Sequence, residues 1–272
     1  MKIGSKDFKL GKRTYVMGIL NVTPDSFSDG GKHNMLEDAL EHAMRMVEEG
    51  ADIIDVGGES TRPNYTMISE EEEIERVVPV IEAIRKISDI PISIDTYKSK
   101  VAKAACIAGA DLVNDIWGLR YDPDMAKVVK EHDVAVCIMH NRKQMDYQNF
   151  LQDLLGDLQV SLSLAEKAGI DGDKIILDPG IGFAKTQDMN LFLLNHLDKL
   201  HQFGYPLLLG CSRKSVIGHV LSETVEERLE GTLATSVIAV MKGCQFIRVH
   251  DIKENVRAIR MAEAILKSNS IV

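Results

Sequence analysis

The sequence predicts a (β/α)8 barrel that forms a single domain over residues 1–272. Eight short apolar segments alternate with longer segments of helical periodicity along the whole chain. The apolar segments show little polar alternation, as expected of parallel strands buried on both faces. No Pro/Gly/Ser-rich linker or low-complexity tract divides them. A doubly wound open sheet, the main rival, would usually have fewer strands or an extra domain.

The expected strands are the β-branched or leucine-rich runs. They cover residues 15–20, 52–56, 91–94, 112–114, 134–139, 174–177, 206–209 and 245–249. Three of the intervening segments repeat apolar residues at helical spacing. These are Leu36, Leu40, Ala43 and Val47; then Ile74, Val77, Ile81 and Ile84; and finally Ile252, Val256, Ile259 and Leu266. Gly50 ends the first helix, and Ser69 caps the second before four glutamates, which we interpret as a solvated helix start.

The composition excludes several classes of protein. With 45% hydrophobic and 27% charged residues, the chain resembles an ordinary globular protein. Its net charge of −9 argues against general nucleic-acid or membrane partners. The four cysteines form no CxxC pair, and no signal peptide or membrane span is visible, so we expect reduced thiols in a cytoplasmic protein.

Polar residues follow the expected strands at their C-terminal ends, where barrels carry their chemistry. Asp95, Asn114 and Asp178 would project together into the barrel mouth, as acceptors for a flat heterocycle rich in N–H donors, with Lys214 facing a ring carbonyl. Two other interpretations remain open. The aspartates could cap helices or pair with Arg and Lys, or they could bind a metal pair, although no His or Glu stands at ligand spacing beside them.

A second group of residues is cationic and would bind phosphate: Arg62, Lys214, Arg248 and His250. A pyrophosphate group usually carries Mg²⁺, for which the Asn21 oxygen is a credible ligand. The loops after the first two strands are rich in Gly, Ser, Thr, Asp and Pro, and Phe27 and Pro63 could pack there against an aromatic second substrate.

Seven segments together resemble the dihydropteroate synthase family. They are MGILNVTPDSFSDGG (17–31), DVGGESTRP (55–63), SIDT (93–96), VNDI (113–116), LDPGIGFAK (177–185), SRKS (212–215) and RVHD (248–251). They span nearly the whole chain in the expected order, and the first two are long and specific.

The resemblance implies a transferase that joins a dihydropterin pyrophosphate to p-aminobenzoate, with loss of pyrophosphate by a dissociative mechanism. It implies catalytic roles for Asp95, Lys214, Arg248 and Asp29. The implied pterin contacts are Asp95, Asn114, Ile116, Met139, Asp178, Phe183, Lys214 and Arg248. Asn21, Arg62, Arg248 and His250 would bind pyrophosphate, with Asn21 also at Mg²⁺; Phe27, Thr61, Pro63, Lys214 and Ser215 would bind p-aminobenzoate. It further implies sulfonamides as inhibitors and a homodimer.

Two other functions stay possible on the same residues. A methyltetrahydrofolate-dependent methyltransferase would share the pterin carboxylates and amide, but the first two loops and the SRKS turn favour the synthase. A non-catalytic pterin-binding paralogue is the other alternative, because a shared fold does not guarantee activity.

Overall fold

Eight parallel strands form a nearly closed barrel in the computed structural model, which describes residues 1–23, 32–59 and 67–268 and the side chains of all of these except residues 32–34. The strands are β3 (Tyr15–Asn21), β4 (Ile53–Gly57), β5 (Ile92–Asp95), β6 (Leu112–Asp115), β7 (Ala135–Met139), β8 (Ile175–Asp178), β9 (Leu208–Leu209) and β10 (Phe246–Val249). Their order is β8-β7-β6-β5-β4-β3-β10-β9, and a parallel bridge between Leu177 and Leu207 joins the two ends of this sheet. The predicted fold class is confirmed.

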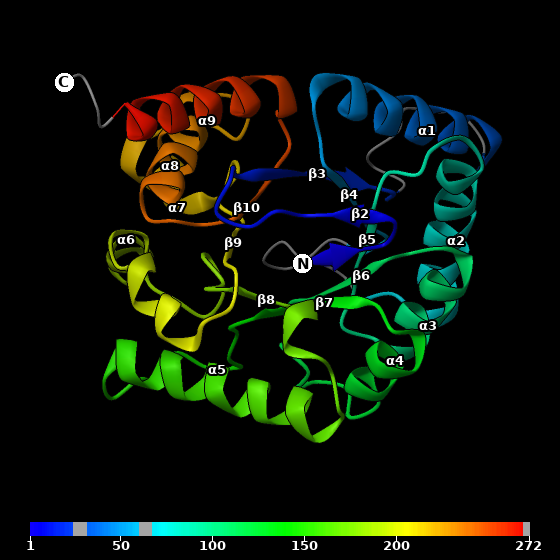
Figure 1. Cartoon of the computed structure of the whole chain (residues 1–272), viewed down its shortest axis with the longest axis horizontal. Helices are drawn as coiled ribbons and strands as arrows, with labels where there is room; N and C mark the ends of the chain where they lie inside the picture. The colour runs from blue at the N-terminus through cyan, green and yellow to red at the C-terminus, as the bar shows by residue number, and fades with distance from the viewer. Residues whose placement is uncertain (24–31, 60–66, 269–272) are drawn as a thin grey trace.

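Helices surround the barrel on all sides (Figure 1). They are α1 (Lys32–Glu49), α2 (Glu70–Ile87), α3 (Ser99–Ala108), α4 (Met125–His132), α5 (Phe150–Lys167), α6 (Gln187–Asn195), α7 (Ser215–Leu221), α8 (Leu229–Met241) and α9 (Ile252–Lys267). Two of them, α7 and α8, fill the single connection between β9 and β10. Among the described residues, no helix has both the length and the apolar character needed to cross a membrane.

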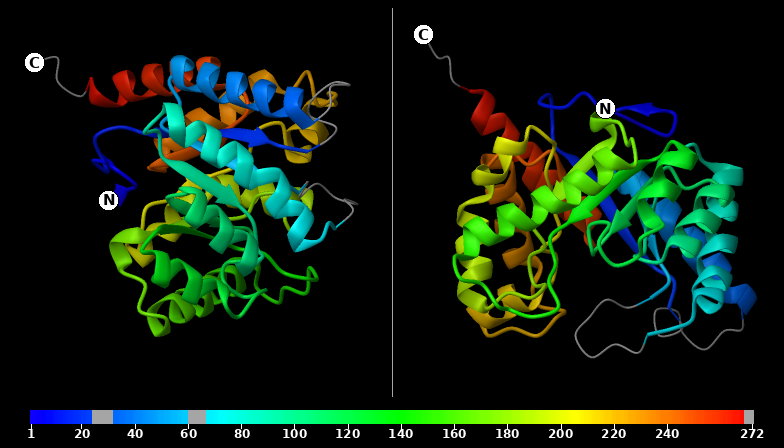
Figure 2. Two further views of the ribbon diagram at one scale, coloured as in Figure 1. Left: turned by 90° about the vertical axis from the view of Figure 1, so that its right-hand side faces the viewer. Right: turned by 90° about the horizontal axis from the view of Figure 1, so that it is seen from below.

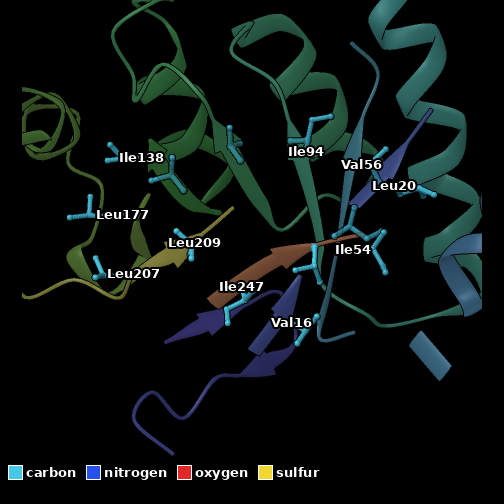
Figure 3. Packing of buried hydrophobic residues seen from close by; sticks show 14 of the residues in the cluster. Val16, Leu20, Ile54, Val56, Ile94, Ile138, Leu177, Leu207, Leu209 and Ile247 are labelled. Carbon is cyan, nitrogen blue, oxygen red and sulfur yellow. The ribbon is translucent and has the colours of Figure 1, made fainter. Parts of the chain in front are cut away.

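The main hydrophobic core lies between the strands and the helices. Alternate strand residues such as Val16, Ile54 and Ile247 point outward from the barrel and pack against the helical layer (Figure 3). The remaining strand residues point into the barrel, where Met17, Ile53 and others form a second apolar cluster. Because both faces of each strand are buried, the strands carry the continuous apolar runs seen in the sequence.

A short N-terminal hairpin, not expected from the sequence, closes the end of the barrel at which the strands begin. It consists of β1 (Lys2–Ile3) and β2 (Lys6–Asp7), and it lies at one end of the molecule in the right-hand view of Figure 2. The Phe8 ring that follows it packs edge-on against Tyr15, with 4.8 Å between ring centres, and lies 5.7 Å from the ring of Phe246. This end of the barrel interior is therefore filled by apolar side chains.

Most of the strands end one residue later than expected, which places polar residues inside the ladder. Asn21 pairs with Gly57, Gly57 pairs with Asp95, and Asp95 pairs with Asn114. The strand expected at residues 206–209 is instead only Leu208–Leu209, because Pro206 has no N–H and the Leu207 N–H donates to the side chain of Gln245. These polar residues therefore lie on the hydrogen-bonded strands themselves, and the strand register sets their depth in the barrel.

The predicted helix signals hold with two corrections. Ser69 caps α2 by accepting from the Glu72 N–H at 3.1 Å, and Gly50 follows α1 in the left-handed region with φ +107°. The glutamate run is not wholly solvated, because the fourth residue, Glu73, is buried and pairs with Lys98 at 2.7 Å. Leu266 is exposed rather than buried, because α9 has passed the end of the core by that turn.

We expect Phe8→Ala to lower the free energy of unfolding by about 3–5 kcal/mol, because it empties a closely packed aromatic site at the floor of the barrel. Urea denaturation followed by circular dichroism would measure the change. Leu10→Ala is the control, since Leu10 is 37% exposed and its truncation should cost no more than about 0.5 kcal/mol. Equal losses from both variants would contradict a structural role for the hairpin contact.

Candidate active site

The barrel mouth, at the end where the strands finish, holds a buried cluster of three charged side chains. Arg248 on β10 lies between two carboxylates: its Nε donates to Asp55 Oδ2 and its Nη2 donates to Asp95 Oδ2, each at 2.5 Å. Asp55 belongs to β4 and Asp95 ends β5, so three strands contribute to the cluster. Charge-assisted hydrogen bonds of this kind are among the strongest available to side chains. We call Asp55, Asp95 and Arg248 the mouth triad.

The mouth triad leaves hydrogen-bonding capacity unused. Asp55 Oδ1 and Asp95 Oδ1 are buried and accept no hydrogen bond within the described part of the chain, and the hydroxyl of Ser93, which pairs with Asp55 in the strand register, is also without a partner there. Buried polar atoms ordinarily have partners, because leaving them unpaired costs about 1–3 kcal/mol each. The unused oxygens therefore indicate a ligand that brings N–H donors into the mouth.

The electrostatics of the mouth favour positive charge. The pKa of Asp95 is raised to about 7, mainly because the carboxyl is buried and also because the Asp55 carboxylate lies nearby, while the Arg248 guanidinium opposes the rise. Burial lowers the pKa of Arg248, but Asp55 and Asp95 outweigh this and hold it above the ordinary range. Two acidic groups thus share one cation, so a developing positive charge beside them would be stabilised.

Asn114, Asp178 and Lys214 lie around the mouth triad. Asn114 Nδ2 donates to Asp55 Oδ2 at 3.2 Å, and Asp178 Oδ1 accepts from the Gly180 N–H at 2.7 Å. Burial raises the pKa of Asp178, which Lys214 and Arg248 oppose, and burial lowers the pKa of Lys214, which Asp178 opposes. The structure therefore brings Asp95, Asn114, Asp178 and Lys214 together, as expected, with Lys214 Nζ donating to the Ile181 carbonyl at 2.6 Å.

An apolar wall stands beside these polar groups. Tyr97, Ile116 and Met139 form a small buried cluster, with Trp117 and Phe183 packed against it. Lys214 Nζ lies 4.7 Å from the centre of the Phe183 ring, within range of a cation–π interaction. A flat heterocycle could lie against this wall with its polar edge toward the carboxylates. Ile116, Met139 and Phe183, which the resemblance assigns to a pterin, therefore do share one surface.

The remaining expected site residues, assigned to pyrophosphate, to p-aminobenzoate or to catalysis, are divided between described and undescribed residues. Asn21 ends β3 half-buried, level with Asp95, and His250 Nδ1 lies 3.0 Å from the Ser212 hydroxyl, which also accepts from the His250 N–H. Ser215 is exposed at the first residue of α7. The remaining candidates lie outside the described residues: Phe27, Asp29, Thr61, Arg62 and Pro63.

A protein-only metal centre is absent from the described residues, because no three His, Cys, Asp or Glu side chains gather there in a suitable arrangement. The alternative of an aspartate-bound metal pair is therefore not supported in this part of the chain. Mg²⁺ commonly keeps waters and phosphate oxygens in its coordination sphere and needs few protein ligands. The Asn21 amide oxygen is compatible with that kind of site.

Several residues at or behind the mouth were not predicted from the sequence. Asp55 stood within an apolar run and looked like part of a strand, yet it joins the mouth triad. Lys185 and His140 are buried and bonded to each other behind the Gly180 turn, with Lys185 Nζ 2.9 Å from His140 Nδ1. Two residues beyond the end of β4, Glu59 accepts from Lys98 Nζ and from the Tyr97 hydroxyl, both at 2.7 Å. For these residues the one sequence signal of a special role was the lysine at position 185, which follows a run of apolar residues and glycines.

Comparison with known proteins agrees with this geometry. The model of the family described as "Pterin binding enzyme" matches residues 17–250. The dihydropteroate synthase of Clostridium beijerinckii is 58% identical over 98% of this chain and 100% of its own length. The crystal structure of the Clostridium difficile dihydropteroate synthase with pteroic acid has a TM-score of 0.93 at 51% identity, covering 95% of this chain and 99% of that one. The Yersinia pestis dihydropteroate synthase in complex with a sulfonamide drug has a TM-score of 0.91 at 44% identity, covering 98% and 99%.

The free energy of unfolding should depend on pH because the pKa of Asp95 is raised in the folded protein. The unfolded chain loses this proton near the ordinary value of 3.8, whereas burial delays the loss in the folded protein until about pH 7. The carboxyl therefore contributes its full stability below the lower value and loses it as the pH rises through the higher one. Asparagine does not titrate. We expect the unfolding free energy of the wild-type protein, minus that of Asp95→Asn, to fall by a few kcal/mol, in order of magnitude, across this range.

Urea denaturation of both proteins at about pH 4.5 and about pH 7.5 would measure this difference. Asp133→Asn is a control at an exposed carboxylate, for which the pH trend should be opposite, because Lys174 lowers the pKa of Asp133. A wild-type advantage over Asp95→Asn that grows with pH would contradict the assigned shift.

Proposed function

This chain belongs to the dihydropteroate synthase family, and we propose that it condenses 6-hydroxymethyl-7,8-dihydropterin pyrophosphate with p-aminobenzoate to give 7,8-dihydropteroate and pyrophosphate. One observation carries the proposal: the mouth triad has buried carboxylate oxygens without partners, beside Asn114, Asp178 and Lys214. An aminopyrimidinone ring presents N–H donors that match these acceptors. Relatives named dihydropteroate synthase, 58% identical in one case, support the same reaction.

The pterin would lie between the carboxylates and the apolar wall. Asp95, Asn114 and Asp178 would accept its N–H groups, and Lys214 would face its carbonyl. Met139, Ile116 and Phe183 would contact the ring faces, with Arg248 over the ring on the side of the pyrophosphate. The related Clostridium difficile structure, determined in the presence of pteroic acid, supports a pterin compound as the ligand class.

We propose a dissociative reaction at this site. The bond between the pterin methylene carbon and the pyrophosphate oxygen breaks first, and its electron pair leaves with pyrophosphate. The ring delocalises the positive charge that remains, and the carboxylates of Asp95 and Asp178 stabilise it as it develops. The amine nitrogen of p-aminobenzoate then forms the new bond to the methylene carbon and loses a proton. No covalent bond to the protein forms, so Cys211 and Ser212 need not act as nucleophiles.

Arg248 would contact both the pterin and the pyrophosphate, the two groups that the breaking bond joins. Its guanidinium pairs with Asp55 and Asp95 through Nε and Nη2, which are two of its three nitrogens. The resemblance assigns Arg248, Arg62, His250 and Asn21 to the departing pyrophosphate, and Asp29 to catalysis in the first loop. Such groups stabilise the leaving anion more strongly as its charge grows, which raises the rate rather than the affinity alone.

The second substrate would bind beside Lys214 and Ser215. The resemblance adds Phe27, Thr61 and Pro63, in the loops after β3 and β4, to this p-aminobenzoate site. Sulfonamides carry the same aminophenyl group and would compete for it. The related Yersinia pestis structure with a sulfonamide supports this class of inhibitor.

We propose Mg²⁺ as the cofactor, held by Asn21 together with pyrophosphate oxygens. The fit rests on the chemistry of the donors: a half-buried amide oxygen at the end of β3 is a hard ligand, and phosphate oxygens and waters complete the preferred octahedral set. When bound, the ion would neutralise charge on the leaving group.

A homodimer and a cytoplasmic location complete the proposal. The neighbouring helices α8 and α9 expose apolar side chains, with Met241 64% and Met261 62% exposed, which would favour association with a second copy. The described cysteines are all free, in keeping with a reducing compartment.

We expect analytical ultracentrifugation of the purified protein to give twice the mass of one chain. Met241→Asp should shift the molecule toward the monomer, because it places a charge on the exposed apolar surface. Lys253→Asp, at an exposed position at the start of α9, serves as the control for the added negative charge. A monomeric wild-type protein at micromolar concentration would refute the dimer.

The proposed reaction is tested by supplying the protein with Mg²⁺, the dihydropterin pyrophosphate and p-aminobenzoate. We expect pyrophosphate release coupled to dihydropteroate formation and blocked by a sulfonamide. Asp95→Asn should fold normally yet lower kcat by about 10²–10³-fold, because a carboxylate that stabilises the cation is lost. Binding of pterin without any product would instead favour the non-catalytic paralogue, and methyl transfer with cobalamin would favour the methyltransferase.

A further inference from the structure

A buried lysine outside the proposed substrate contacts holds the turn that carries Phe183. Lys185 is 8% exposed, and its Nζ donates to two carbonyl oxygens of this turn, those of Gly180 at 2.8 Å and Phe183 at 2.9 Å. Its third partner is His140 Nδ1, at 2.9 Å. An ammonium group has three N–H donors, so all of its hydrogen-bonding capacity is used inside the protein.

A fixed chain of polar groups supports this lysine from behind. Because His140 Nδ1 accepts from Lys185, the ring carries its proton on Nε2, which donates to Asp157 Oδ2 at 3.0 Å. Asp157 belongs to α5 and also accepts from Arg142 Nε at 2.5 Å. These hydrogen bonds therefore link the Asp157 carboxylate on α5, through His140 after β7, to the turn after β8.

The turn held by Lys185 reaches the proposed site at two points. The Ile181 carbonyl accepts from Lys214 Nζ at 2.6 Å, and the Phe183 ring lies 4.7 Å from the same nitrogen. Gly180 and Gly182 adopt positive φ, at +71° and +85°, which glycine does freely, but Ala184 also has a positive φ of +45°, which a non-glycine residue rarely adopts and which contacts around it must hold. Lys185 Nζ makes no hydrogen bond to a side chain that is proposed to contact substrate.

We propose that Lys185 is a positioning residue for the pterin site: by clamping the 180–183 turn it holds the Phe183 ring and the Ile181 carbonyl, and through them Lys214, in place for the heterocycle. This inference rests on the proposed function for its ligand. A lysine suits the task because one ammonium group gathers two carbonyls and an imidazole, which an apolar side chain could not do. Burial lowers the pKa of Lys185 to about 7, against the effect of Asp178, and the charged form of Lys185 in turn lowers the pKa of Asp178.

The test is Lys185→Met, which keeps the length of the side chain and removes its donors. We expect the Kd of 6-hydroxymethylpterin, measured by calorimetry, to rise about tenfold or more, in keeping with the loss of charge-assisted hydrogen bonds. Lys174→Met is the control: Lys174 also donates to a backbone carbonyl, at 2.6 Å from Asp133 O, but it immediately precedes β8, at the opposite end of that strand from the turn.

A double-mutant cycle separates positioning from general support of the fold. If Lys185 acts through Lys214, the effect of Lys185→Met on the Kd of the pterin should shrink at least about threefold in a Lys214→Met background. A folded Lys185→Met with pterin binding within about twofold of wild type, or with the same loss in both backgrounds, would overturn the proposal.

Lys185→Gln, which retains two donors without the charge, replaces the methionine variant if that one does not fold, with the same expectations. Because the readout is binding of a pterin without pyrophosphate, it remains valid if the wild-type protein binds pterin but forms no dihydropteroate. In that case the proposed reaction fails while the inference about Lys185 can still succeed.

Discussion

The contact between Arg248 and the two carboxylates of Asp55 and Asp95 is the constraint on which the barrel mouth depends. Three side chains from three strands are taken out of water together, and each charge is tolerable only because the others are present. Removing one partner of such a group leaves an uncompensated buried charge, which commonly costs about 3–5 kcal/mol. The barrel therefore bears a cost at this end for an arrangement with no packing purpose, as expected of a functional site.

One end of the barrel interior contributes to stability, and the other end carries the proposed chemistry. At the floor, Phe8, Tyr15 and Phe246 pack their rings together and leave few polar groups to satisfy. At the mouth, β4 presents Asp55, β5 presents Asp95, and β10 presents Arg248, two residues beyond Phe246. Since side chains alternate between the two faces of a strand, one register serves the outer core, the floor and the mouth at the same time.

The fold and much of the mouth could be predicted from the sequence, and the failures have physical causes. Asp95 and Asp178 were identifiable because each follows an apolar run and is the last residue of its strand. Asp55 was missed because its role depends on Arg248, which is remote in sequence. Glu73 was misjudged because a run of glutamates resembles a solvated helix start, although the fourth one turns inward to meet Lys98. The partners of Lys185 come from two separate segments, His140 after β7 and the turn after β8, and only the folded chain brings them together.

The N-terminal hairpin has a consequence for how the protein is made. Phe8 and Tyr15 are synthesised well before their partner Phe246 and the neighbouring strand β10. The nascent polypeptide must therefore carry an open apolar sheet edge until β10 has been made. The barrel cannot close before then, because its closure needs a contact between strands that are remote in sequence.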